Sequence, residues 1–465
     1  MSRSLALLCL LLGIWSTTSG AQESELAETN EFSFEEDLVL ELPEVEAAPE
    51  APPAFGLLPR WTLDAWTAYR FRTERLVSNR LSLRLELEQL WGERWFWRFD
   101  GKSAWNLIYN EALYPERDYP EAVREEFRWW TSWREGFVQG RFGALSLKIG
   151  QQVLVWGKAD ASVVTDLISP RDQTELFSTP VDESRIGQRL LTLDYYPGAN
   201  QQLTLFLNPD PQVNRYAPAG HEYALSAAGA GFVVLPEQLP VFGKEPEFGL
   251  RWASTREAVD FSACWAELMD NDPVYVRKRL ELQMVGGVPT PVPVLEPQYR
   301  RFRLLGGGAQ VGSGDFLWKG EGALWLEKDF VSSAASGDGT TERTVRVLAL
   351  GMDYSKAAGD QWSLEASSQW IEDWDASLTD TQEQQELVFA SWTRRFLHET
   401  LAPQVALLHQ PSRGEWMLQG ELQYDWSDVV QVRMATQSFQ VHLEDTSLGQ
   451  LSPLRQLSFQ LSAVF

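Results

Sequence analysis

Basic side chains at alternate positions near the start of the chain are the first candidates for chemistry. Within residues 60–107 the even-numbered positions carry a set of cations: Arg70, Arg72, Arg80, Arg84, Arg94, Arg98 and Lys102. The same parity supplies four carboxylates: Asp64, Glu86, Glu88 and Asp100. If both sets line one narrow lumen, the excess of positive charge would attract anionic solutes. The alternative, which we favour, is that these charges pair with one another across neighbouring strands.

A second candidate is the segment 149–172, which reads IGQQVLVWGKADASVVTDLISPRD. It begins as a strand and continues as a loop that opens with Trp156 and Gly157. Three carboxylates, Asp160, Asp166 and Asp172, follow in this loop, with Lys158 and Arg171 among them. Long loops carry function more often than chance would give. We expect this loop to fold back and constrict a pore, either by contacting a solute or by pinning itself to the wall.

Enzymatic chemistry is not expected from the remaining polar residues. The four histidines, His221, His398, His409 and His442, fall in different segments without metal-ligand spacing. No Gly-x-Ser-x-Gly element is present. The run 306–308 is three glycines, and we expect it to bend a strand rather than bind phosphate, because no helix pattern follows it. No catalytic residue, metal or cofactor is predicted.

The elements that position these residues are strands. Between Arg80 and Glu88, leucines at 81, 83, 85 and 87 alternate with polar or charged residues. Successive side chains of a strand face opposite sides, so one face here is entirely leucine and the other polar. A helix would distribute the same leucines around its circumference. The segment is therefore predicted to be a strand with one apolar face.

The same alternation predicts eighteen strands between residues 60 and 465. Their expected bounds are 60–72, 79–91, 94–107, 127–140, 144–156, 185–196, 201–208, 246–255, 258–268, 299–311, 315–328, 342–354, 361–372, 385–396, 400–409, 414–426, 429–441 and 455–465. The region 209–298 leaves sixteen strands as an alternative. Within it, residues 275–285 could form another strand and 223–232 could pair with it.

The connectors between these segments alternate in length. Short connectors such as 92–93, 141–143 and 197–200 contain glycine, whereas the connectors 108–124, 157–184, 209–245 and 269–298 are long. Short turns at one rim and long loops at the other are typical of transmembrane β-barrels of the outer membrane. We therefore predict an all-β, antiparallel barrel with short periplasmic turns, long extracellular loops and both termini in the periplasm.

Aromatic residues and the C-terminal pattern favour a membrane barrel over a soluble all-β protein. The chain has 21 Trp residues, and Trp91, Trp95 and Trp426 flank predicted turns. Trp is favoured at a membrane interface, because its ring is amphipathic. The stripe Leu457, Phe459, Leu461, Ala463 and Phe465 ends the chain. It resembles the signal that the barrel-assembly machinery reads on the last strand, so that machinery and outer-membrane lipid are the expected partners.

The N-terminus predicts export. A short basic region, an apolar run at residues 5–15 and small residues at 19–21 form a secretory signal peptide, residues 1–21. Residues 22–54 hold eleven acidic residues and no basic one, which predicts a mostly disordered, acidic periplasmic leader before a barrel at 55–465. The net charge of −25 argues against binding to nucleic acid. Cys264 is the only cysteine after the signal, so no intrachain disulfide is expected.

The segment 149–172 also resembles a known family. Members of a porin-like family of proteobacterial outer-membrane proteins, labelled a domain of unknown function, carry a Gly-x-Gln-x-Val-x-Trp-Gly block, then an acidic residue and a later Asn-Pro-x-Asp. The matching positions are Gly150, Gln152, Trp156, Gly157, Asp160, Asp166, Pro170 and Asp172. Ser169 stands where Asn is usual, and Leu154 departs from the Val of the block. The specific match covers about twenty-four residues.

The expected function follows from closure of the sheet. In lipid a spanning sheet must close on itself, and sixteen to eighteen strands enclose a lumen wide enough for water unless loops fill it. We therefore expect a porin-like channel for small or amphiphilic solutes. The resemblance further implies export of a lipid with an inner-membrane transporter of the resistance-nodulation-division (RND) type. The alternative is a scaffold or adhesin acting through the long loops, with the Pro-rich run 288–297 as a rigid exposed finger.

Overall fold

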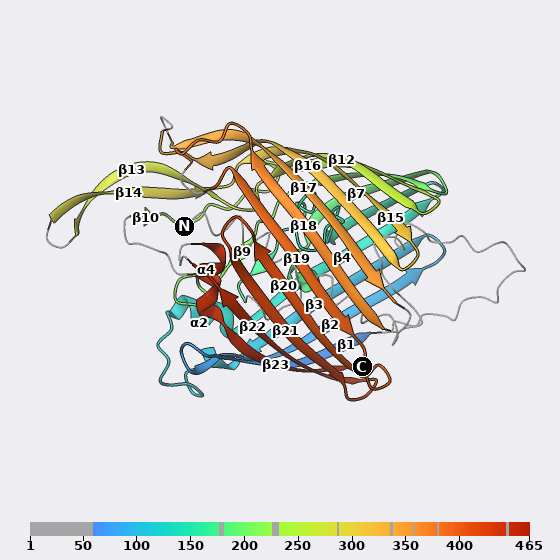
Figure 1. Cartoon of the computed structure of the whole chain (residues 1–465), viewed down its shortest axis with the longest axis horizontal. Helices are drawn as coiled ribbons and strands as arrows, with labels where there is room; N and C mark the ends of the chain where they lie inside the picture. Colours follow the sequence, from blue (N-terminus) through green and yellow to red (C-terminus); the bar gives the residue numbers. More distant parts are fainter. Residues whose placement is uncertain are drawn as a thin grey trace, which may run out of the picture.

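A computed structural model describes residues 59–465, with gaps at 176–180, 226–231, 286–287, 335–337, 357–358, 379–380 and 443–445. The predicted signal peptide and the acidic leader at 22–54 lie outside the described residues. Most of the described chain forms a single large antiparallel sheet that closes into a barrel (Figure 1).

The barrel has eighteen strands, which confirms the larger of the two predicted counts. They are β1 (Arg60–Arg70), β2 (Arg75–Trp91), β3 (Trp95–Asn106), β4 (Trp129–Phe142), β5 (Leu145–Gln152), β7 (Gln188–Gly198), β8 (Gln201–Asn208), β11 (Glu247–Arg256), β12 (Val259–Met269), β15 (Arg301–Ser313), β16 (Phe316–Val331), β17 (Thr340–Ser355), β18 (Asp360–Ile371), β19 (Gln384–Arg394), β20 (Leu401–Gln410), β21 (Glu415–Asp425), β22 (Val430–Gln440) and β23 (Gln456–Val464). Each strand pairs with the next in this order. The first and last strands pair antiparallel and close the ring.

Alternation along each strand decides which side chains face outward. Leu81 and Leu83 on β2 are 41% and 44% exposed, whereas Arg80 and Ser82 at the alternate positions are buried. The same division continues across the closing pair, where Leu457, Phe459 and Leu461 of β23 lie on the outer face. The sheet therefore presents apolar side chains outward and encloses its charged ones, as a barrel in lipid requires.

The two ends of the barrel differ in connector length. Turns of two to six residues join the strands at the end where Trp61 and Phe465 exchange backbone hydrogen bonds of 3.0 and 2.9 Å; we call this the turn end. The opposite end, the loop end, carries the long connectors, including 107–128, 153–187, 209–246 and 270–300. Trp91 and Trp426 lie exposed next to connectors of the turn end, as the sequence predicted.

One predicted long loop is instead a hairpin. Strand β13 (Val274–Val285) pairs with β14 (Val288–Gln298), and β14 pairs in parallel with the short β10 (Val233–Val234). The hairpin projects from the loop end of the barrel (Figure 1). Residues 275–285 do form a further strand, as the sequence allowed, and β14 pairs with it; residues 226–231 of the other segment considered, 223–232, lie outside the described residues. Because the prolines of β14 lie at alternate positions, the N–H groups that they lack would all point to the same edge of the strand. The other edge keeps its hydrogen-bond donors, so a Pro-rich segment can still be a strand.

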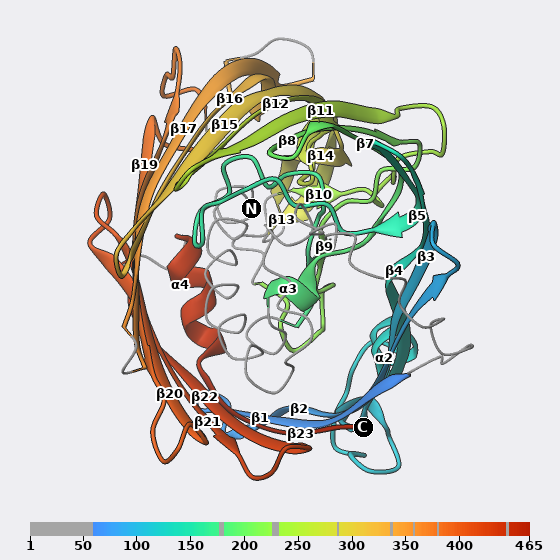
Figure 2. The ribbon, with the colours of Figure 1, turned by 90° about the vertical axis from the view of Figure 1, so that its right-hand side faces the viewer.

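The remaining elements are short and lie at the loop end or inside the barrel. They are η3 (Leu107–Tyr109), α2 (Glu121–Arg128), β6 (Asp172–Gln173), α3 (Val181–Ser184), β9 (Arg215–Tyr216), α4 (Ser447–Leu451) and η4 (Ser452–Leu454). Figure 2 looks along the barrel and shows α3 and α4 inside the ring of strands. Within the described ranges, no helix has the length and apolar character needed to span a membrane.

Strand β5 ends earlier than the alternation predicted, at Gln152 rather than at 156. Gly150 has a φ of +132° and lies so close to β4 that a Cβ atom there would stand 2.3 Å from the carbonyl oxygen of Gly136. Beyond it, Leu154 bonds to the hydroxyl of Ser169 through both its backbone N–H (2.9 Å) and its carbonyl (3.1 Å). The chain leaves the wall after Gln152. Beyond this point the Ser169 side chain, rather than a neighbouring strand, satisfies the backbone groups of Leu154.

Candidate functional site

The connector between β5 and β7, residues 153–187, folds into the barrel rather than outward (Figure 2). We call it the strap; its described parts are 153–175 and 181–187. Its apolar residues Val164 and Ile168 are fully buried, and Trp156 packs edge-on against Phe206 of β8 with ring centroids 5.3 Å apart. The sequence allowed this loop to fold back toward the wall, and the structure shows that it does.

Two carboxylates of the wall hold the first half of the strap. Glu321 of β16 accepts hydrogen bonds from the backbone N–H groups of Lys158 (2.7 Å) and Ala159 (2.8 Å) on one oxygen. Its other oxygen accepts from the backbone N–H of Thr165 (2.9 Å) and from the Thr165 hydroxyl. Glu321 is 4% exposed, so these bonds form away from bulk water, where a charged acceptor binds amide donors strongly.

Glu365 of β18 holds the next two residues of the strap in a similar way. It accepts from the backbone N–H groups of Asp160 (2.6 Å) and Ala161 (3.2 Å). Beside it, the hydroxyls of Ser162 and Ser367 are 2.5 Å apart. In the described structure, residues 158–161 of the strap pair with no strand. Wall carboxylates accept from their backbone N–H groups instead.

The acidic residues of the strap are themselves paired. Lys319 of β16 bonds to Asp160, which also accepts from the hydroxyl of Ser363 at 3.1 Å. Asp166 lies 2.8 Å from Arg185 and 3.2 Å from Arg171, and so ties the outgoing and returning halves of the strap together. Burial raises the pKa of Asp160, although the nearby Lys319 ammonium opposes that rise.

The second half of the strap reaches a different part of the wall. Glu175 bonds to Arg80 of β2 and accepts from the amide of Asn106 at 3.2 Å. Glu183 of α3 lies 3.0 Å from Lys102 of β3 and 3.3 Å from Arg84 of β2. These contacts lie on the wall formed by the first strands of the barrel.

The two attachment points face each other across the barrel. Counting round the ring from β2, strand β16 is the ninth neighbour of eighteen, so β2 and β16 are on opposite walls. The strap is bonded to Glu321 on one wall and to Arg80 on the other. It therefore crosses the lumen and divides its cross-section.

A second inward segment joins the strap. Residues Arg215–Tyr216 (β9), from the connector that follows β8, pair in parallel with Asp172–Gln173 (β6) of the strap. Arg215 also bonds to the carboxylate of Asp172 at 3.1 Å. Further along the same connector, the Tyr223 hydroxyl donates to Gln456 of β23 at 2.8 Å. The connector thus fastens the strap to the wall beside the closing strands.

The structure places the family-motif residues at the points where the strap is fastened. Gly150 and Gln152 lie in β5, and Gln152 donates to the carbonyl oxygen of Leu190 at 3.0 Å. A Cβ atom at Gly157 would stand 2.9 Å from Cβ of Asp166, so only glycine fits where these two parts of the strap approach each other. The carbonyl oxygen of Pro170 accepts from the backbone N–H of Ile186 at 2.7 Å. The roles of Trp156, Asp160, Asp166 and Asp172 are those described above.

The predicted pore-lining residues divide into two groups. On or next to the inner wall lie Arg70, Arg80, Arg84, Arg98, Lys102, Glu86 and Asp100. Arg72 and Arg94 lie exposed in turns, at the loop end and the turn end respectively. A role in lining a solute path stays a prediction for all of them, but Arg72 and Arg94 do not add charge to the wall.

The wall cations near the strap have carboxylate neighbours. Arg84 binds Asp100 through two bonds of 2.8 and 2.7 Å, and Arg98 lies 2.9 Å from Glu135 and 3.0 Å from Glu88. With Glu175 and Glu183 added by the strap, the basic excess counted from the sequence no longer holds at this level of the lumen. The pairing alternative therefore describes the arrangement, and the expected attraction for anions has no support from this part of the wall.

Sequence reasoning missed Glu321 and Glu365. Both are single carboxylates among the alternating residues of ordinary wall strands, and nothing in their spacing sets them apart from other inward-facing acids. Their role depends on a segment more than 150 positions away in the chain, which only the closed barrel brings to them.

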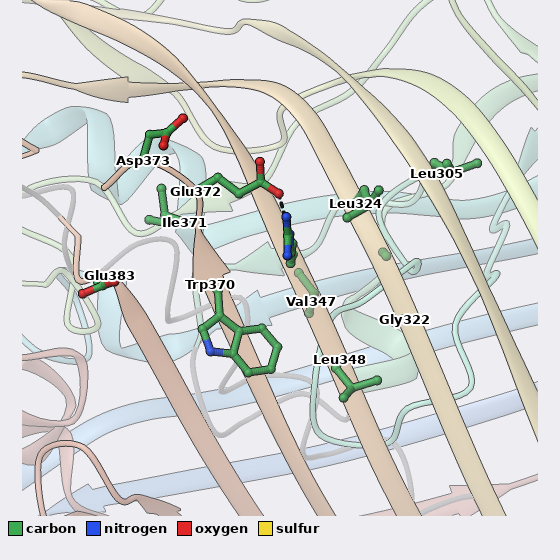
Figure 3. Close-up of a pocket in the computed structure, with 12 residues that line it drawn as sticks. Leu305, Gly322, Leu324, Val347, Leu348, Trp370, Ile371, Glu372, Asp373 and Glu383 are labelled. Carbon is green, nitrogen blue, oxygen red and sulfur yellow. Dashed lines mark hydrogen bonds and ion pairs between the residues drawn. The ribbon is translucent and has the colours of Figure 1, made fainter. Parts of the chain in front are cut away.

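A surface hollow lies on the outside of the barrel. It encloses about 810 Å³ on the outer face of β15–β18, where Gly322 leaves a gap between Leu305, Leu324 and Leu348 (Figure 3). The ion pair of Arg346 and Glu372 lies at its edge. Because this hollow faces away from the strap, we do not include it in the candidate site. Among the described residues, no group of three His, Cys, Asp or Glu side chains is arranged to hold a metal ion.

Comparison with known proteins identifies a family and a fold. The family model described as Protein of unknown function (DUF1302) matches residues 68–450. Among solved structures, OccAB1 and OccAB3 of Acinetobacter baumannii each superpose with a TM-score of 0.51, at sequence identities of 10% and 9% respectively. Each superposition covers 88% of this chain, and it covers 95% of OccAB1 and 98% of OccAB3. OccK8 (OprE) of Pseudomonas aeruginosa gives 0.50 at 10% identity, covering 88% of this chain and 97% of its own. No curated protein sequence matches the chain. At such low identity the structures establish the fold alone, a closed antiparallel barrel.

Proposed function

The chain belongs to the family Protein of unknown function (DUF1302), and from its strapped lumen we propose that it is an outer-membrane channel for small polar solutes. The predicted signal peptide supports export, and the apolar outer face supports residence in lipid. In this proposal the turn end and both termini are periplasmic, and the loop end faces the outside of a Gram-negative cell.

The observation that carries the proposal is the attachment of the strap to opposite walls. A strap fastened through Glu321 on β16 and Arg80 on β2 narrows the lumen at a fixed level. A barrel that serves only as a scaffold does not require a loop fixed across its lumen, because packed side chains could fill that lumen. A constriction is useful where passage must be limited by the size and charge of a solute.

The walls around the strap favour polar solutes over lipids. On the side of β1–β4 the inner surface carries paired charges, including Arg84 with Asp100. On the side of β12–β18 the inner surface carries an apolar patch beside Glu321 and Glu365, and the strap covers it: Val164 and Ile168 belong to one buried cluster with Leu304 and Trp325. An amphiphile could contact this apolar surface only if the strap moved away from it.

Reconstitution in a planar lipid bilayer tests the proposal. The purified full-length barrel should give stepwise single-channel currents in potassium chloride, and proteoliposomes containing it should swell in small sugars or amino acids. Failure of correctly folded barrel to pass either ions or small solutes would overturn the proposal. A current that appears only with an added partner would instead favour the export role, with an RND-type transporter, that the family resemblance implies.

A second candidate function rests on the β13–β14 hairpin. It projects from the loop end, and Leu280, Leu282 and Met284 on β13 are 63–75% exposed. Such an apolar strand on a projecting hairpin favours a scaffold that binds a partner outside the barrel. Replacing residues 276–296 by a short turn separates the two functions: a channel keeps its conductance, whereas a scaffold loses its partner.

A further inference from the structure

A small cavity at the loop end has an unusual supply of hydrogen-bond donors. It encloses about 240 Å³ between the start of β2, the connector 107–128 and the connector after β8. Three guanidinium groups line it: those of Arg70, Arg75 and Arg117. Glu222 is the one buried carboxylate among them, and Asp118 lies exposed at the edge.

Glu222 is already saturated by its neighbours. It accepts from Arg70 (3.2 Å), from Arg75 (2.8 Å) and from the hydroxyl of Tyr119 (2.5 Å), and Arg117 lies 3.6 Å away. Three cations therefore share one buried anion. A carboxylate with four donors around it has little capacity left for the remaining N–H groups of these arginines.

Several donors at the cavity have no partner among the described residues. Arg70 is 6% exposed, and its Nε and Nη2 atoms make no hydrogen bond. The Nε2 atom of His221, a residue that is 5% exposed, is also without a partner. Buried donors of this kind are rare in folded proteins unless water, an ion or a ligand satisfies them.

His221 is held in the tautomer that makes Nε2 a donor. Its Nδ1 atom accepts from the backbone N–H of Tyr223 at 3.2 Å, so the proton of the neutral ring must be on Nε2. Burial lowers the pKa of His221 to about 4, which keeps the ring neutral at pH 7. The ring is stacked on Tyr109 and packs against Phe127, and these contacts fix its orientation.

We propose that this cavity binds a small oxyanion, a carboxylate or phosphate group of a free solute, at the loop-end mouth of the barrel. Arg70, Arg75 and Arg117 supply the charge, and the N–H of His221 supplies a neutral donor. The planar guanidinium groups suit the oxygen pairs of such groups. The walls admit a compact anion and leave no room for a bulky one. The inference deepens the proposed channel by giving it a solute site at its entrance.

Isothermal titration calorimetry of the purified full-length barrel with inorganic phosphate, and separately with acetate, tests the site. Wild type should bind at least one of them, and Arg117→Gln and His221→Phe should each weaken that binding at least tenfold. Phenylalanine keeps an aromatic ring against Tyr109 and removes the Nε2 donor, together with the Nδ1 acceptor of the Tyr223 N–H. The charge-matched control is Arg94→Gln, because Arg94 lies exposed at the opposite end of the barrel and its loss should leave affinity unchanged.

Three results would overturn the oxyanion site: no heat from either anion in folded wild type, unchanged affinity in both variants, or an equal loss in the Arg94→Gln control. Resistance of the barrel to SDS without heating shows that each variant has folded. The assay measures binding and needs no current, so the site and the channel can fail separately. Binding without conductance would remove the channel and leave the site.

Discussion

Glu321 and Arg80 lie on opposite walls of the barrel, and one segment of chain is bonded to both. Glu321 holds the backbone at 158–165, and Arg80 binds Glu175 of the same strap. The strap bridges strands that are nine positions apart in a ring of eighteen. This bridge turns a wide barrel into a constricted one.

Replacing the carboxylate of Glu321 should release the first half of the strap. In Glu321→Gln the amide group places a donor against N–H groups that need an acceptor, so buried donors lose their partner at a cost of about 1–3 kcal/mol. We expect larger and noisier single-channel currents. Glu421→Gln is the matched control, because Glu421 faces inward on β21, lies 3.2 Å from Arg433 and has no contact with the strap in the described structure. Unchanged currents in Glu321→Gln would contradict the assigned role.

A disulfide should link the strap to the wall where Ser162 meets Ser367. The hydroxyls of these two residues are 2.5 Å apart, so thiols at the two positions would lie next to each other. Ser162→Cys with Ser367→Cys should cross-link on mild oxidation, as peptide mass spectrometry would detect. Ser162→Cys paired with Ser458→Cys on β23 should not. Equal cross-linking of both pairs would mean that the strap is not held where we describe it.

Removing the strap carboxylate at Glu183 should change ion selectivity. Removal from bulk water alone would raise the pKa of Glu183, but Lys102 and Arg84 outweigh that effect and lower it, so the group is ionised at pH 7. Glu183→Gln leaves these two wall cations less compensated and should shift the reversal potential in a salt gradient toward anions. Glu93→Gln removes the same charge from an exposed turn at the turn end and should shift it little. A shift toward cations would contradict the argument.

The contact of His221 with Tyr109 and Phe127 should weaken in acid. The pKa of His221 is lowered to about 4 from an ordinary value of about 6.5. As the pH falls, the imidazole therefore takes up a proton at a higher pH when it is released from Tyr109 and Phe127 than when it is packed against them. The stability of this contact is therefore complete above pH 6.5 and falls as the pH drops toward 4, by roughly 3 kcal/mol in all. Hydrogen exchange of residues 209–225, corrected for intrinsic rates, should rise between pH 7 and pH 5. In His221→Phe this dependence on pH should disappear, and its persistence would exclude His221 as the cause.

The barrel was predictable from the sequence because its pattern is local. The leucines at 81–87 alternate with charges, and glycine-containing turns such as that at Gly143 mark the strand ends, so all eighteen strands were placed within a few residues. Strand β14 was missed because its prolines argue against a strand unless one edge is free.

The fastening of the strap was not predictable, since it depends on contacts distant in sequence. The motif at 150–172 singled out this loop, and its length made fold-back a possibility. The sequence could not tell that Glu321 and Glu365 supply its acceptors, because any inward-facing carboxylate fits the same alternation. The balance of charge was missed for a related reason, as Glu175 and Glu183 reach the wall only through the folded strap.

The most direct test of the account compares single-channel conductance in planar bilayers before and after the strap is removed. Replacing residues 158–168 by a short Gly-Ser linker deletes every contact with Glu321 and Glu365 while leaving the eighteen strands intact. We predict that wild type conducts in small steps and that the variant conducts severalfold more in each step. Equal conductance in the two proteins, or silence in both, would contradict a channel constricted by the strap.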